Sequence, residues 1–202
     1  MDRLYPLLEA FDEADTKAER AAVEAKLFDT YSKLGAILVT DMSGFSRITQ
    51  ARGIVHYMNM IRRMRLAMAK AVAELDGQLV KFVGDNAFAS FKEPAQAAQA
   101  VRLAQERLAD EDRDRDDDSK VLLAGGIDFG DYLAIAGDDF FGDPVNVASK
   151  LGEDLATGGE LWLSERAYQG IPQSFLDEWE ASWQVTKVTV SGVKLKTYQT
   201  RI

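Results

Sequence analysis

The chain has 202 residues, of which 47% are hydrophobic and 28% are charged, and its formal net charge is −9. This length predicts a globular protein of one domain with extensions, or of two small domains. The negative charge argues against a general nucleic-acid binder, and the absence of cysteine excludes disulfides and thiolate metal sites. No apolar run approaches the roughly 20 residues of a membrane helix, and no secretory signal pattern is present, so we expect no membrane segment and a cytoplasmic location.

Residues 1–34 are predicted to be helical, because apolar side chains recur at helical spacing within residues 4–11 and again within residues 23–31. We interpret this stretch as a helical extension that packs on the domain or on a second copy of the chain. A regulatory arm is the alternative interpretation. A single domain then spans residues 35–202.

The rest of the chain alternates strands and helices. Short apolar runs bounded by turn residues predict strands at residues 36–40, in a hairpin at 78–91, at 121–130, 131–139 and 159–165, and in a terminal hairpin at 183–202. Helical spacing predicts helices at residues 48–75, 93–109, 143–156 and 166–169. The acidic run at 110–120 is typical of a solvated loop. This β-α-β-β-α-β order predicts an α+β protein with a ferredoxin-like core, appended C-terminal strands and the N-terminal helical extension.

Two aspartates stand at predicted strand ends. Asp41 follows the first buried strand, and Asp85 lies at the tip of the next hairpin. The first and third strands of a ferredoxin-like sheet are neighbours, so these two carboxylates could share a divalent metal, and Mg²⁺ prefers oxygen ligands of this kind. Two such ions could hold both the attacking and the leaving oxygen of a phosphoryl displacement. The competing interpretation is that each is a turn residue, because Asp beside Gly is common in tight turns.

The turn after Asp41 offers backbone N–H groups close to a helix start, which is a natural seat for a phosphate. Its candidate residues are Ser43, Gly44 and Phe45. The only histidine, His56, falls inside the long helix that follows, and we interpret it as structural.

A second group of polar residues occurs in the stretch "DDFFGDPVNVASKLGED". It places a carboxylate at Asp139, an amide at Asn146 and an ammonium at Lys150. The last two are four residues apart, so they are neighbours on one face if the segment is helical.

Three blocks in this order, "VTDMSGFS", "VKFVGDNAFASF" and "DFFGDPVNVASKL", resemble the signature blocks of class III nucleotide cyclase catalytic domains, the adenylyl and guanylyl cyclases. The resemblance covers roughly residues 35–198. It implies a homodimer of such domains arranged head to tail, with active sites in the shared cleft and two Mg²⁺ or Mn²⁺ ions per site. One copy then supplies the metal ligands, and its partner supplies the base-contacting and catalytic residues.

The resemblance implies a role for each matching residue. Asp41 and Asp85 match the two metal-binding aspartates, and we include Met42 in the same metal set. Lys81 and Asp139 match the pair that contacts the base.

Three further positions concern the ribose and the phosphates. Asn146 matches the residue that orients the ribose or the transition state. Lys150 stands where the family has an Arg that stabilises charge at the α-phosphate. The guanidinium of Arg offers several hydrogen-bond donors in one plane, whereas the ammonium of Lys is a compact point charge. Lys194 or Lys196 could take the place of the family's terminal-phosphate Lys.

The chemistry of Lys81 and Asp139, the two residues that match the base-contacting pair, agrees with ATP as substrate. A carboxylate at Asp139 can accept from the adenine amino group, and an ammonium at Lys81 can donate to the ring nitrogen. Guanine reverses both polarities, whereas cytosine shows the same order as adenine, so a cyclase for another nucleotide stays open.

We therefore predict an adenylate cyclase that converts ATP to cyclic AMP and pyrophosphate by intramolecular attack of the 3′-oxygen, without a required protein base. The alternative is a weak or inactive cyclase-fold protein that binds nucleotide or regulates a partner, which Lys150 favours. A diguanylate cyclase is disfavoured because the chain has no "GGDEF"-like stretch.

Overall fold

The computed structural model describes residues 4–135, 139–179, 182–190 and 192–202. Within these residues the strands form a single sheet in the order β2-β3-β1-β4-β6-β8-β7, with β5 paired to β4. The strands are β1 (Ser32–Met42), β2 (Gln78–Val83), β3 (Asn86–Phe91), β4 (Leu123–Ile135), β5 (Asp139–Phe141), β6 (Glu160–Ser164), β7 (Gln184–Val190) and β8 (Val193–Arg201). The helices are α1 (Leu4–Asp12), α2 (Lys17–Tyr31), α3 (Phe45–Arg52), α4 (Ile54–Glu74), α5 (Pro94–Glu111), α6 (Asp143–Ser149), α7 (Glu165–Gln169) and α8 (Gln173–Glu178).

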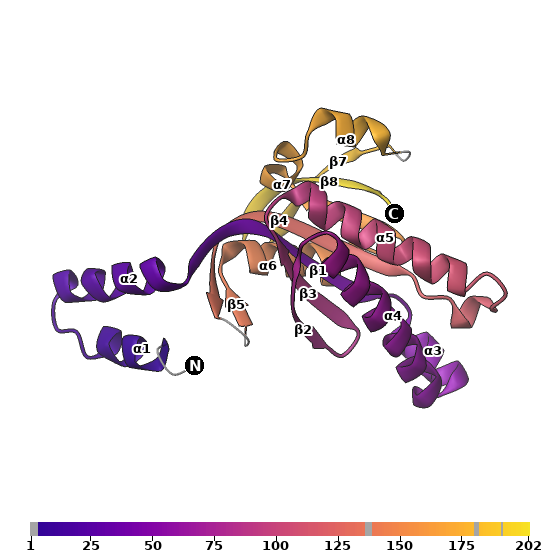
Figure 1. Ribbon diagram of the computed structural model, residues 1–202, viewed down its shortest axis with the longest axis horizontal. Helices are drawn as coiled ribbons and strands as arrows, with labels where there is room; N and C mark the ends of the chain where they lie inside the picture. Colours follow the sequence, from indigo (N-terminus) through magenta and orange to yellow (C-terminus); the bar gives the residue numbers. More distant parts are fainter. Residues whose placement is uncertain (1–3, 136–138, 180–181, 191) are drawn as a thin grey trace.

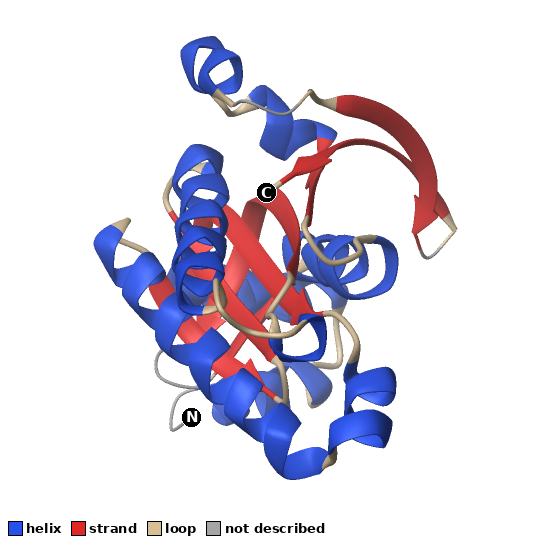
Figure 2. Cartoon of the chain, turned by 90° about the vertical axis from the view of Figure 1, so that its right-hand side faces the viewer, coloured by secondary structure: helices blue, strands red, loops and turns tan. Residues whose placement is uncertain are grey.

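The ferredoxin-like core predicted from the sequence is confirmed. Strands β2, β3, β1 and β4 are neighbours in that order and pair antiparallel, while β6, β8 and β7 extend the sheet beyond β4. Helices α4 and α5 lie side by side across one face of the sheet (Figures 1 and 2). The fold is therefore of the α+β class with appended C-terminal strands.

Strand β1 is the centre of the core because it is covered on both faces. On one face Ala36 and Leu38 pack in the same cluster as Met64 and Met68 of α4. On the other face lies a second cluster that contains Ile37. Helix α6 approaches this second face closely, because a Cβ atom at Gly126 would lie 2.2 Å from a backbone oxygen of α6.

The N-terminal extension is helical, but it consists of two helices and ends earlier than predicted. Thr16 caps α2 in a capping box with Glu19, which starts a new helix after α1. The chain leaves the helix at Tyr31 and joins the sheet at Ser32, which pairs with β4, so Leu34 belongs to the strand rather than to the extension. Figure 1 shows α1 and α2 projecting from one end of the domain.

Three other boundaries differ from the prediction. The expected helix at 48–75 starts earlier and is divided into α3 and α4 at Gly53, whose φ of +84° strongly favours glycine. The strands expected at 121–130 and 131–139 are one long strand from Leu123 to Ile135, because Gly130 and Asp131 pair with β1 instead of turning. Residues 136–138 of the second prediction lie outside the described residues, and Asp139 belongs to β5. The expected helix at 143–156 is α6 followed by a π-helical turn, Lys150–Leu155.

The remaining elements agree with the sequence more closely. The terminal hairpin pairs Val190 with Val193, and of its predicted turn residues Ser191 lies outside the described residues. The acidic run contains a short 3₁₀ helix, Asp117–Ser119, and α8 was not predicted. In the part of the chain that the structure describes, no helix has the length and apolar character needed to cross a membrane.

Candidate functional site

Asp41 and Asp85 meet at one edge of the sheet, as predicted. Thr40 of β1 pairs with Ala87 of β3. Asp41, which follows Thr40, therefore lies close to the turn before Ala87, and this turn carries Asp85. Both aspartates line one open cavity of about 670 Å³. The cavity is also lined by Met42 and by the predicted phosphate turn, Ser43, Gly44 and Phe45.

A buried tyrosine of α4 connects the end of β1 to the turn that carries Asp85. The Tyr57 hydroxyl donates to Asp85 Oδ2 at 2.7 Å and lies 3.4 Å from the Met42 carbonyl oxygen. Arg65, on the same helix, donates to the Gly84 carbonyl at 2.6 Å. Sequence reasoning missed both residues, because nothing in a mid-helix Tyr or Arg indicates which loop its polar end will reach. Helix α4 therefore positions the turn that carries Asp85.

The aspartate edge has an excess of negative charge. Burial, helped by the charges of Asp85 and Glu153, raises the pKa of Asp41 to about 6 even though the N–H of Met42 donates to Asp41 Oδ1 at 2.7 Å and lowers it. Burial, followed by the hydrogen bond to Asp85, also raises the pKa of the Tyr57 hydroxyl. A cation in this cavity would relieve the repulsion between the carboxylates.

The donor set fits a hard divalent ion that keeps further ligands. Within the described residues, no three His, Cys, Asp or Glu side chains are grouped so that they could hold a metal. Two carboxylates, a backbone carbonyl and substrate phosphates are nevertheless the oxygen donors that Mg²⁺ uses when it is not fully enclosed by protein.

The turn residues lead directly into α3, which begins at Phe45. The first N–H groups of a helix have no partner within it and are available to an anion. Arg47 of the same helix also lines the cavity, where it forms an ion pair with Asp118 of the acidic run. Arg47 is a further cation near the phosphate seat that the sequence pattern did not indicate.

Lys81 and Asp139, the predicted base-contacting residues, are brought together from β2 and β5. The Lys81 ammonium lies 2.6 Å from Asp139 Oδ2, and the two side chains are about one-third exposed (32%) and one-quarter exposed (26%). Lys81 also lies 5.1 Å from the centre of the Phe88 ring. Their charges neutralise each other, so a nucleobase would have to exchange its own hydrogen bonds for this ion pair.

Asn146 and Lys150 are neighbours, as their spacing predicted. They line a small cavity of about 230 Å³ together with Glu153 and Asp154. Lys150 lies 2.5 Å from Asp154, and the hydrogen bond to this carboxylate raises the pKa of the Lys150 ammonium. Lys150 therefore carries a full charge, but that charge is directed at a carboxylate of its own turn.

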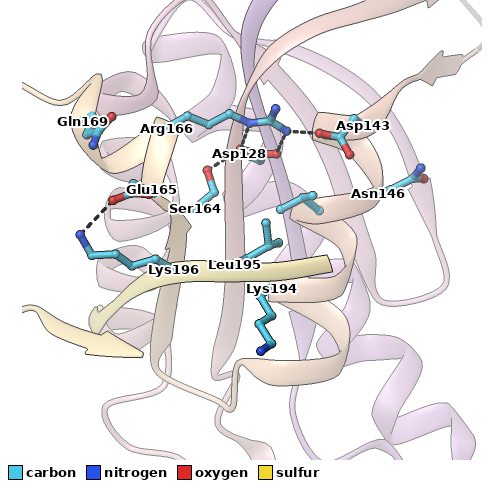
Figure 3. A pocket seen from close by; sticks show the side chains of 11 residues that line it. Asp128, Asp143, Asn146, Ser164, Glu165, Arg166, Gln169, Lys194, Leu195 and Lys196 are labelled. Carbon is cyan, nitrogen blue, oxygen red and sulfur yellow. Dashed lines mark hydrogen bonds and ion pairs between the residues drawn. The ribbon is translucent and has the colours of Figure 1, made fainter. Parts of the chain in front are cut away.

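Lys194 lines a third cavity, of about 410 Å³, which it shares with Asn146 (Figure 3). In this cavity Arg166 bridges Asp128 and Asp143, and Lys196 lies 2.9 Å from Glu165. In Figure 3 the side chain of Lys194 extends away from Arg166. Lys196, the second candidate for the terminal phosphate, is thus already paired with Glu165.

The predicted residues line different cavities on one copy of the chain, although Glu153, beside Asn146 and Lys150, is close enough to Asp41 for its charge to raise the pKa of that carboxyl. None of the base-contacting or catalytic candidates lines the cavity of Asp41 and Asp85. These candidates are Lys81, Asp139, Asn146, Lys150 and Lys194. We call the cavity with the aspartates the metal half-site and the other group the base half-site.

Comparison with known proteins agrees with the fold. No family model matches the chain. The protein "Putative adenylate cyclase 3" of Rhizobium meliloti (strain 1021) is 28% identical over 137 residues, which are 68% of this chain and 23% of that protein. An "Adenylate cyclase" of Streptomyces coelicolor is 30% identical over 116 residues, which are 57% of this chain and 29% of that protein. The chain thus spans less than a third of the length of either relative.

A solved structure matches over almost its whole length. An adenylate/guanylate cyclase/hydrolase from Silicibacter pomeroyi is 25% identical, with a TM-score of 0.69 over 85% of this chain and 98% of that one. The resemblance seen in the three sequence blocks is therefore confirmed at the level of the fold.

Proposed function

We propose that this chain, which has the fold of the class III adenylyl and guanylyl cyclase catalytic domains, converts ATP to cyclic AMP and pyrophosphate. The observation that carries the proposal is the presence of both half-sites on one chain. Two carboxylates and a phosphate seat share one cavity, and a Lys–Asp pair with adenine polarity lies outside it.

The active site combines two copies of the chain. The metal half-site and the base half-site of one copy do not share a cavity. A head-to-tail homodimer would place the metal half-site of each copy against the base half-site of the other. A closed two-fold pair of this kind has two equivalent sites.

The residues of the two half-sites account for the parts of the reaction. The ribose 3′-oxygen attacks the α-phosphorus, its proton leaves to water, and the bond to the bridging oxygen of pyrophosphate breaks. The N–H groups at the start of α3 hold the phosphates, and Asn146 orients the ribose. Lys150 supplies positive charge as negative charge develops on the α-phosphate, so catalysis is alignment and charge stabilisation.

Mg²⁺ or Mn²⁺ fits the metal half-site. Asp41, Asp85 and the carbonyl of Met42 would hold two such ions, together with the triphosphate. Ions held there would supply positive charge to the phosphate oxygens and make the 3′-hydroxyl a better nucleophile. Tyr57 fixes the orientation of the Asp85 carboxylate for this task.

Lys81 and Asp139 select the base. Their polarity suits adenine, since the carboxylate accepts from the amino group and the ammonium donates to the ring nitrogen. Guanine would set its N1–H donor against the Lys81 ammonium and its O6 acceptor against the Asp139 carboxylate, and two such unpaired polar contacts strongly disfavour that base.

A second candidate function is nucleotide binding without turnover. It is favoured by Lys150, which stands in place of an Arg and is paired with Asp154. In this case the chain would bind ATP at the two half-sites but release it unchanged.

The test is to incubate the purified chain with each of the four ribonucleoside triphosphates and Mg²⁺ or Mn²⁺, and to identify the products by mass. We expect cyclic AMP from ATP and no cyclic GMP from GTP. The matched control is the Asp41→Asn, Asp85→Asn double variant, which should give no product. ATP bound and recovered intact by the unsubstituted chain would instead favour the second candidate.

A further inference from the structure

Two exposed apolar surfaces on this chain have no partner among the described residues. The first lies on the N-terminal arm, which we define as residues 4–31. Helix α1 buries none of its residues, and Tyr5, Leu8 and Phe11 are exposed although they are large and apolar. Leu8 and Phe11 lie on one face of the helix, since they are three residues apart.

The second surface lies on the outer face of α4. Val55, Met58 and Leu66 are all more than half exposed, at 77%, 60% and 51%. Met58 and Leu66 line a shallow cavity of about 340 Å³, together with Ile61. We call this the α4 groove.

The charges beside the two surfaces are complementary. Residues 4–16 contain four carboxylates and no Lys or Arg. The α4 groove is lined by Arg62 and Arg65, whose partners among the described residues are uncharged: Arg62 donates to Asn59, and Arg65 donates to the Gly84 carbonyl and lies over the Phe82 ring. An acidic helix with an apolar face is the kind of partner that such a basic, apolar groove accepts.

The dimensions of the two surfaces also agree. Helix α1 has 9 residues, which at about 1.5 Å per residue gives a length of about 13 Å. The groove residues from Met58 to Leu66 extend over about 12 Å of α4 by the same rise, and the exposed Val55 continues the apolar surface by about 4.5 Å. The whole of α1 can therefore lie along the groove.

The arm does not cover the groove of its own chain. Figure 1 shows α1 and α2 at one end of the molecule, with α3 and the start of α4 at the opposite end. The arm and the groove could each be buried if two copies exchanged arms.

We propose that α1 of one copy docks in the α4 groove of a second copy, and that the exchange is reciprocal. Reciprocal exchange closes a pair of chains, whereas one-way docking would build an open filament. The contact also places the arm on the helix whose Tyr57 and Arg65 hold the Asp85 turn. This proposal goes beyond the cyclase proposal and does not require turnover.

Disulfide trapping tests the contact directly, because the natural chain has no cysteine. A Leu8→Cys chain is mixed with a Met58→Cys chain, oxidised, and run on a non-reducing gel. We expect a cross-linked pair made of one chain of each kind. The control replaces the second chain by Lys187→Cys, an exposed position on β7, and should give little cross-linking.

The charge pattern gives a second test of the same contact. Arg62→Glu in the Met58→Cys chain should reduce the cross-link severalfold, and Glu9→Lys in the Leu8→Cys chain should restore it. A mixed pair no more abundant than the Lys187→Cys control would overturn the proposal. Equal cross-linking of Leu8→Cys chains with themselves would also overturn it, because the arms would then pair with each other. Since no readout depends on cyclic AMP, failure here is distinct from failure of the cyclase proposal.

Discussion

The metal half-site and the base half-site differ in how their charges are balanced. In the metal half-site the charge of Asp85 adds to the effect of burial, and together they raise the pKa of Asp41 to about 6. In the base half-site the charged groups are paired, Lys81 with Asp139 and Lys150 with Asp154. The carboxylates of the first group therefore disfavour each other's charge, and a bound cation would stabilise both of them. The charged side chains of the base half-site already have partners in their own chain, and they must give up these ion pairs to contact the nucleotide.

The largest effect should come from removing a carboxylate of the metal half-site. Asp41→Asn keeps the size and the hydrogen bond from Met42 but removes the charge. We expect cyclic AMP production to fall by about a thousand-fold or more, since the proposed reaction depends mainly on charge stabilisation at the phosphates. Circular dichroism should show an unchanged fold. Normal turnover by this variant would refute the assignment of Asp41 to the metal.

A smaller effect should follow from loosening Asp85 while keeping its charge. Tyr57→Phe removes only the hydroxyl that donates to Asp85. Loss of a partner behind a metal ligand weakens metal binding by about 10–100-fold, so the Mg²⁺ concentration for half-maximal activity should rise by that factor. The activity at saturating Mg²⁺ should fall much less. An unchanged Mg²⁺ dependence would show that Tyr57 is only a packing residue.

In the base half-site we expect replacement of Lys150 by Arg to be tolerated, because Arg keeps the positive charge. Lys150→Arg should retain activity or raise it by up to about tenfold, since a guanidinium can hold the α-phosphate with two hydrogen bonds. The comparison is made by turnover at saturating ATP. Complete loss of activity would mean that position 150 has another role in this chain.

The smallest expected effect is on stability and follows from the strain at Asp41. Its folded pKa lies above the unfolded value, so the folded state binds this proton more tightly and loses stability as pH rises from about 4 to about 6. Asp41→Asn should therefore be more stable than the natural chain at pH 8 by about 1 kcal/mol, after allowing for solvent screening, and equal to it at pH 3.5. Urea unfolding without Mg²⁺ at both pH values measures the difference. A variant that is less stable at pH 8 would argue against strain at this edge.

The sequence predicted the parts of this picture that depend on local pattern. Asp41 and Asp85 were placed together because strand ends follow from apolar runs, and the β-α-β-β-α-β order makes β1 and β3 neighbours. The Lys81–Asp139 pair was expected only from the resemblance to the cyclases, because no local rule joins residues of β2 and β5.

The features that the sequence did not predict depend on tertiary contacts. Tyr57 shares an apolar helix face with Met60 and Met64, so its pattern indicates core packing and not a hydrogen bond to Asp85. Within the π-helical turn that begins at Lys150, Gly152 approaches β1 so closely that a Cβ atom would lie 2.5 Å from a backbone oxygen. Helical periodicity carries no sign of such an approach.

The central claim is that each active site takes its metal half-site from one copy and its base half-site from the other. It is tested by mixing an Asp41→Asn, Asp85→Asn chain with a Lys81→Ala, Asn146→Ala chain, each inactive alone, and measuring cyclic AMP. Mixed pairs would contain one intact site, so the account predicts recovery of about a quarter of the natural activity if the chains pair at random. No recovery, with mixed pairs demonstrated in the same sample by differently tagged chains, would contradict it.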